Sequence, residues 1–87
     1  ADSEIQSLHK IMEGQVEALE FSVKGEIEGL TGVPLMKLSL RKNVLVAVIV
    51  HEGKILIPTG SDSISAGDTV VVMVADEKTK SIEDIVV

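Results

Sequence analysis

The sequence predicts a small α/β (α+β) domain in which a mixed, mainly antiparallel sheet is flanked by helices. Valine and isoleucine dominate a hydrophobic content of 45% that includes one aromatic residue, and β-branched side chains favour strands. Apolar residues alternate over residues 16–23 and run without interruption over residues 44–50, and both patterns are typical of strands. Helical spacing of apolar residues near both ends predicts the flanking helices.

The opening segment has the pattern of a helix. Ser3 can cap this helix, and Gln6 three residues later completes a capping box. The apolar residues of the segment follow helical spacing, at Ile5, Leu8 and Met12. Gly14 is a suitable stop. Because a helix this short is only marginally stable alone, we expect its apolar stripe to dock on another part of the protein.

The next segment predicts a strand, a loop and a short helix. Residues 16–23 alternate between apolar and polar side chains, as in a strand with one buried face. Glycines between residues 25 and 32 mark a loop. Pro34 is tolerated in a first helical turn, and the apolar residues that follow it predict a short helix with one buried side.

A central strand and a hairpin follow. The run over residues 44–50 is apolar on both faces, which predicts a central strand covered on both sides. Glu52 and Gly53 provide a two-residue turn with glycine second. Residues 54–57 then return as the hairpin partner, and Pro58 ends that strand.

The last third predicts a loop, a strand and a closing helix. Residues 59–68 are rich in serine, aspartate and glycine, and Gly67-Asp68 is typical of a tight turn. Residues 69–74 are almost wholly apolar and predict the last strand. Asp76 can cap the closing helix. The apolar residues of that helix are Ile82, Ile85 and Val86.

Composition excludes several classes of function. The net charge of −6 and the single aromatic residue argue against a nucleic-acid partner, which needs a basic surface or stacking rings. There is no cysteine, so disulfides and thiolate metal sites are excluded. The longest apolar run falls far short of the ~20 residues that span a bilayer, so we expect a soluble domain without membrane insertion. Residues 37–54 hold four cations and one acid, which is either a small anion-attracting patch or ordinary surface variation.

No catalytic or metal-binding constellation is present in the sequence. The two histidines, His9 and His51, lie far apart in the chain, and neither accompanies a nucleophile motif or metal-ligand spacing. The glycines between residues 25 and 32 lack the Gly-Lys-Ser/Thr ending of a phosphate-binding loop. We therefore expect no enzyme activity, no metal and no cofactor in this chain.

The order and spacing of three segments resemble the TrkA-C family. These are LSLRKNVLVAVIVHEGKILIP at residues 38–58, ILIPTG at 55–60, which overlaps the end of the first, and GDTVVV at 67–72. The resemblance covers residues 16–75, and one departure is Arg41 in place of the usual proline. TrkA-C is the C-terminal half of a regulatory module of potassium transport, so the resemblance implies a regulatory domain over residues 15–87 preceded by a linker or N-terminal helix over residues 1–14.

The resemblance also implies partners and a location. It implies a cytoplasmic homodimer that acts on a membrane potassium-transport subunit through the full-length protein, at the inner face of the plasma membrane. NAD(H) or ATP would bind only in an upstream nucleotide-binding domain. TrkA-C domains also occur as sensors attached to other transporters, antiporters and transcription regulators, and this alternative host stays open.

Several members of the family bind cyclic di-AMP between two C-terminal domains. By position, the resemblance implies effector contacts at Val48, Ile49, His51 and Pro58. The chain departs from the binding members, which tend to place an arginine near the strand end, where this chain has His51. A histidine is mostly neutral at pH 7, with an unperturbed pKa of ~6.5, so we expect weaker attraction for phosphate.

Overall fold

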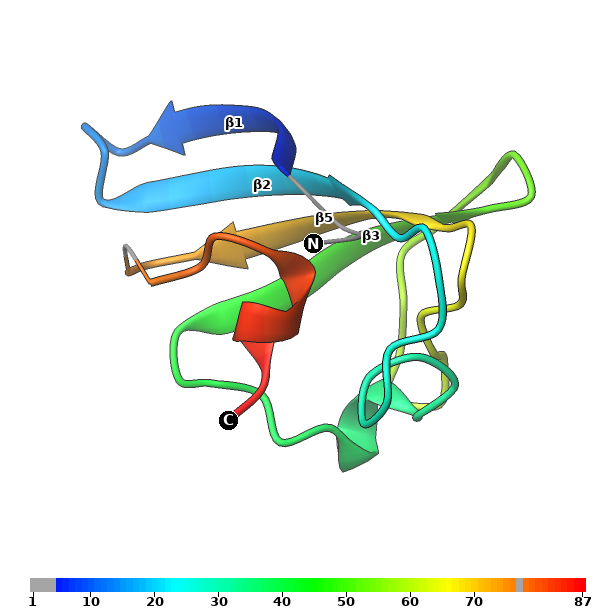
Figure 1. Cartoon of the computed structure of the whole chain (residues 1–87). Coiled ribbons are helices and arrows are strands. Elements are labelled where there is room, and N and C mark those ends of the chain that lie inside the picture. The colour runs from blue at the N-terminus through cyan, green and yellow to red at the C-terminus, as the bar shows by residue number, and fades with distance from the viewer. Residues whose placement is uncertain (1–4, 77) are drawn as a thin grey trace.

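The computed structural model describes residues 5–76 and 78–87. In this part of the chain five strands form one sheet in the order β1-β2-β5-β3-β4, and every neighbouring pair is antiparallel. The strands are β1 (Ile5–Ile11), β2 (Val16–Ser22), β3 (Val44–His51), β4 (Lys54–Leu56) and β5 (Thr69–Val74). The predicted strands and their antiparallel character are confirmed. Figure 1 shows the connecting segments gathered beside the sheet.

The predicted opening helix is wrong, because its described residues form the edge strand β1. Met12 and Glu13 adopt positive φ angles of 55° and 59° and, with Gly14, turn the chain back into β2. Leu8 then lies opposite Leu19 of β2. The backbone groups at the edge of β2 therefore form hydrogen bonds with β1. This strand pairing outweighs the weak helical preference of the opening segment. Ser3 lies outside the described residues, and the division of the chain at residue 14 stays a prediction.

The hairpin between β3 and β4 agrees with the prediction. Glu52 and Gly53 both have positive φ, 48° and 78°, as a type I′ turn requires, and His51 pairs with Lys54 across it. The register of β3 against β5 shifts between Val46 and Val48, where the strand bulges.

The hydrophobic core lies on one face of the sheet. The register aligns Leu19 with Val72 and Phe21 with Val70, and all four side chains are buried. The segments that follow β2 and β4 add Leu30 and Ile64 to this core. The second face of the sheet is also largely apolar. The sequence predicts that β3 is covered on both faces, but among the described residues Leu45 on the second face is 61% exposed.

Among residues 5–76 and 78–87, helical structure is limited to two short 3-10 turns, η1 (Leu35–Lys37) and η2 (Ile82–Ile85). The first lies where the sequence predicts the short helix, but it is a single 3-10 turn without a fully buried residue, and Leu35 is only partly buried against the core. The long closing helix is wrong: η2 begins after Ser81, whose capping box with Asp84 holds one turn, and it buries Ile82 and Ile85 in the core. Figure 1 shows η2 in front of β3 and β5. Asp76, the predicted cap, instead pairs with Arg41.

Candidate functional site

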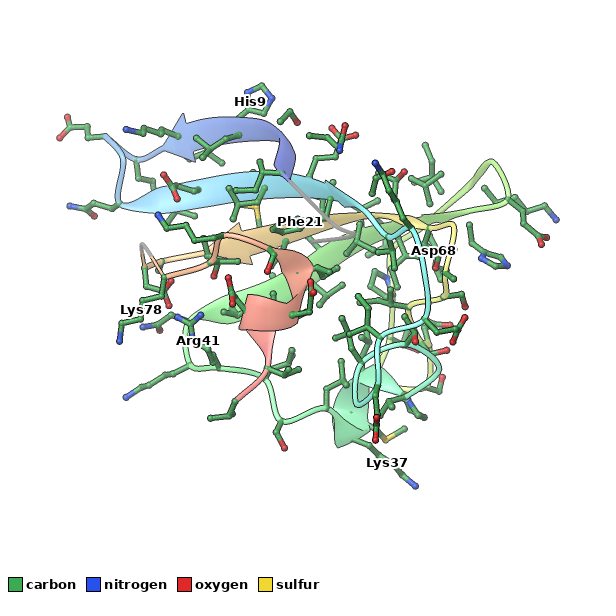
Figure 2. All side chains as sticks on the ribbon, viewed as in Figure 1. His9, Phe21, Lys37, Arg41, Asp68 and Lys78 are labelled. Carbon is green, nitrogen blue, oxygen red and sulfur yellow. The ribbon has the colours of Figure 1, made fainter. Side chains whose placement is uncertain are left out.

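A histidine–aspartate pair joins the end of β3 to the start of β5. His51 Nδ1 lies 2.6 Å from Asp68 Oδ1, and the other carboxylate oxygen of Asp68 accepts the Ser65 N–H at 2.8 Å. The Asp68 side chain is 2% exposed, whereas the His51 side chain is 49% exposed. Figure 2 shows Asp68 near the end of the sheet from which the β3–β4 hairpin extends. A buried carboxylate thus has an exposed imidazole as one of its partners.

The turn before β5 places Asp68. Gly67 has a φ of +91° and donates its N–H to the Val23 carbonyl at 2.6 Å, while the Asp68 carbonyl accepts the Val23 N–H at 2.8 Å. These two bonds tie the turn to the chain just beyond β2. The predicted Gly67-Asp68 turn is confirmed, and its geometry fixes the carboxylate under His51.

The hydrogen bond that His51 donates to Asp68 and the negative charge of that carboxylate raise the pKa of His51 above its ordinary value of 6.5. Glu52 adds a smaller effect in the same direction, with its carboxylate 3.7 Å from Nε2. His51 is therefore protonated to a higher pH than an isolated histidine.

A hollow of about 280 Å³ opens beside His51. It is lined by Ile49 and Leu56 on the sheet side and by Asp62 and serine side chains on the loop side. The serines are Ser61, Ser63 and Ser65. Hydroxyl groups together with an imidazole offer hydrogen bonds to a small polar ligand.

The four residues predicted as effector contacts are only partly brought together. Ile49 and His51 line the hollow, although Ile49 is 1% exposed and belongs to the core. Val48 points to the opposite face of the sheet, because it pairs with Val71 rather than with the buried Val70. Pro58 is half-buried beyond the end of β4. Their role as effector contacts stays a prediction.

The cations of residues 37–54 do not form a patch. Arg41 is engaged by the C-terminal segment: it pairs with Asp76 and donates to the Asp84 carbonyl at 2.7 Å. Figure 2 shows Lys37 at η1 and Arg41 beside the C-terminal segment, whereas Lys54 begins β4, next to the hairpin turn. The local excess of cations is therefore spread over the surface, and Arg41 has a structural role.

The second face of the sheet and its β4 edge expose large apolar side chains. Leu45 of β3 and Ile55 of β4 lie on this face, by their pairing with Met73 and Val50, and are 61% and 77% exposed. Ile57, just past β4, is 71% exposed. Apolar surface gathered on one face and one edge is typical of an interaction surface.

Sequence reasoning missed Asp68 as the partner of His51. The signals were present, since His51 ends an apolar strand and Asp68 follows a turn glycine, but pairing them requires the strand order. Within residues 5–76 and 78–87, no three His, Asp or Glu side chains are grouped to hold a metal ion. In the same residues no helix is long and apolar enough to cross a membrane.

Comparison with known proteins gives the family. The sequence model of the TrkA-C domain matches residues 28–87, well over half of the chain. The chain is also 29% identical over 79 residues to the Trk system potassium uptake protein TrkA homolog 2 of Methanosarcina mazei. That alignment covers 91% of this chain but 17% of the relative. The chain therefore belongs to the TrkA-C domain family.

Proposed function

We propose that this chain is a regulatory and assembly domain of a Trk-type potassium-uptake protein. The observation that carries the proposal is the family match over residues 28–87, supported by similarity to a protein named for potassium uptake. In this role the domain works at the inner face of the plasma membrane and controls cation transport through a membrane partner. It has no catalytic activity of its own.

The exposed apolar surface supports a homodimer. Leu45 and Ile55 leave a sheet face that a second copy covers, and a two-fold interface is the commonest arrangement among soluble oligomers. The repulsion between two chains of charge −6 is lowest where the contact carries few charges, and β4 contributes one, Lys54. Assembly through this surface links the regulatory state of one domain to that of its partner.

We propose that the His51–Asp68 pair has a structural role rather than a catalytic one. Such a pair resembles two members of a hydrolytic triad, but the third member must be a nucleophile within hydrogen-bond reach of Nε2. Among the described residues, the group recorded beside Nε2 is the Glu52 carboxylate at 3.7 Å, not a hydroxyl. The pair therefore joins two segments rather than activating a nucleophile.

The assembly test compares two substitutions that change charge equally. Ile55→Lys places a cation on the exposed apolar face, whereas Met36→Lys changes a residue of η1 that is similarly exposed, 68% against 77%. We expect light scattering to show a dimer for the native chain and for Met36→Lys, and a monomer for Ile55→Lys. In the full-length protein, Ile55→Lys should also reduce rubidium uptake into potassium-starved cells. Normal uptake by that variant would contradict the proposed role.

The hollow beside His51 supports a second candidate, an effector-sensing domain attached to a transporter or a transcription regulator. The imidazole and three serines offer hydrogen bonds there, and a phosphate group of cyclic di-AMP could accept them. Because Arg41 is held by Asp76, it supplies no charge to the hollow. Calorimetric titration with cyclic di-AMP tests this candidate: one molecule bound per dimer supports it, and no heat of binding opposes it.

A further inference from the structure

We propose that the His51–Asp68 pair is a proton-controlled clasp, which holds the β3–β4 hairpin against the loop of residues 59–68. His51 lies on the hairpin side, as the last residue of β3 and the cross-strand partner of Lys54. Asp68 lies on the loop side, where its buried carboxylate also accepts the Ser65 N–H. The 2.6 Å contact between the two side chains is therefore a direct bond between the two segments.

The strength of the bond depends on the protonation state of His51, because the Asp68 carboxylate is buried and keeps the same two hydrogen-bond partners. Asp68 is 1% exposed overall, and its two carboxylate oxygens are satisfied by His51 and by Ser65. His51 keeps a proton on Nδ1 for this bond in both of its charge states, so the proton that it loses is the one on the exposed Nε2. A charged donor makes a stronger hydrogen bond to a carboxylate than a neutral one. Loss of that proton therefore weakens the clasp without breaking it.

The charged groups around His51 are mainly acidic. Asp68 from the turn before β5, Glu52 from the hairpin and Asp62 from the loop side of the hollow are acidic. Lys54, directly across the hairpin, is the basic residue among them. When His51 is charged, it compensates the charge of Asp68; when His51 is neutral, the charge of Asp68 is left without a cationic partner. The clasp is thus tightest at low pH, and the hollow becomes more negative as the pH rises.

The sign of the pH dependence follows from the raised pKa of His51. A group whose pKa is higher in the folded state stabilises the fold fully below its unfolded pKa, and this contribution is lost as the pH rises through the folded pKa. The clasp therefore weakens as the pH rises from about 6.5 upward, a range in which ordinary carboxylates no longer titrate. Each unit of pKa elevation corresponds to about a tenfold change in the folding equilibrium.

The experiment measures the clasp directly in the native chain. An NMR titration of the His51 ring gives its pKa, and hydrogen exchange gives the protection factor of the Ser65 amide, which bonds to Asp68. Urea unfolding at about pH 6 and about pH 8.5 then compares the native chain with His51→Gln and His9→Gln. Glutamine can still donate to Asp68 but cannot titrate, and His9→Gln controls for the removal of an exposed histidine from β1.

We expect His51 to titrate above 6.5, and the protection factor of the Ser65 amide to fall as that titration proceeds. The urea midpoint of the native chain and of His9→Gln should fall between the two pH values, whereas that of His51→Gln should stay constant. A His51 pKa at or below 6.5 would overturn the proposal. An equal fall of the midpoint in His51→Gln would overturn it as well. Neither result depends on whether the domain regulates potassium uptake.

Discussion

Replacing Gly67 with alanine tests the turn that places Asp68 under His51. Gly67 has a φ of +91°, a conformation that costs a residue with a Cβ about 1–2 kcal/mol. A Cβ built at this position meets nothing within 4 Å, so the cost comes from the backbone and not from a clash. Alanine also restricts the unfolded chain, which returns about 0.4–1 kcal/mol.

The two effects leave a net loss of about 1 kcal/mol in the free energy of unfolding of Gly67→Ala. In a domain of this size that loss lowers the melting temperature by about 4–8 °C. The matched control is Gly25→Ala. At Gly25 a Cβ also meets nothing within 4 Å, but φ lies outside the positive range. The control should therefore be neutral or stabilising by up to about 1 kcal/mol.

Thermal unfolding followed by circular dichroism measures both variants against the native chain. The reasoning requires Gly67→Ala to melt below the native chain and Gly25→Ala to melt at or above it. If both variants melt together, the positive φ of Gly67 is not what the turn depends on. The placement of Asp68 would then need another explanation.

Three further substitutions test the C-terminal segment. Among the described residues the buried Thr79 hydroxyl has no hydrogen-bond partner. Thr79→Val should therefore raise the free energy of unfolding, measured by urea titration, by about 1 kcal/mol. A lower free energy of unfolding in this variant would contradict the burial of an unpaired hydroxyl. Hydrogen bonds from the Lys80 and Ser81 backbone lower the pKa of Asp84 below 3.8, so its capping contribution is present above that value and lost as the pH falls through the lowered pKa. Asp84→Asn should cost about 1 kcal/mol at neutral pH and little in strong acid, and thermal melts showing equal costs at both would refute this. Arg41→Met keeps the aliphatic part of the side chain but removes the ion pair with Asp76 and the hydrogen bond to the Asp84 carbonyl. Amide hydrogen exchange in η2 should therefore become about tenfold faster. Unchanged exchange would show that Arg41 does not hold the C-terminal segment in place.

The strands could be read from the sequence because their signals are local. Residues 16–22, 44–51 and 69–74 are strands for the reasons that alternation and β-branched runs predict. The hairpin turn followed from Glu52-Gly53 alone, since a type I′ turn needs two residues that tolerate positive φ. These features depend on nearest neighbours along the chain, and so does the turn at Gly67.

The helices at the two ends could not be predicted correctly, because tertiary contacts decide them. Ile5 and Leu8 have helical spacing, but the free edge of β2 pairs with this segment as a strand. At the other end, Asp76 is a good cap by residue type, yet Arg41 engages it across 35 residues. Ser81 then takes over the capping role, and a single turn remains.

The candidate site was predictable only in part. His51 could be singled out because it ends an apolar strand, but its partner Asp68 lies 17 residues away and depends on β3 and β5 being neighbours. The resemblance implies one site that includes both Val48 and Ile49, although adjacent residues of a strand face opposite sides. Strand order and side-chain direction are thus the information that the sequence pattern lacked.

The central claim is that the apolar face around Ile55 holds two copies of this domain together for regulation of potassium uptake. The most direct test is the light-scattering mass of the native chain beside that of Ile55→Lys, with Met36→Lys as the control. The account predicts twice the mass of one chain for the native protein and for the control, and the mass of one chain for Ile55→Lys. A native chain that remains monomeric at high concentration would contradict it.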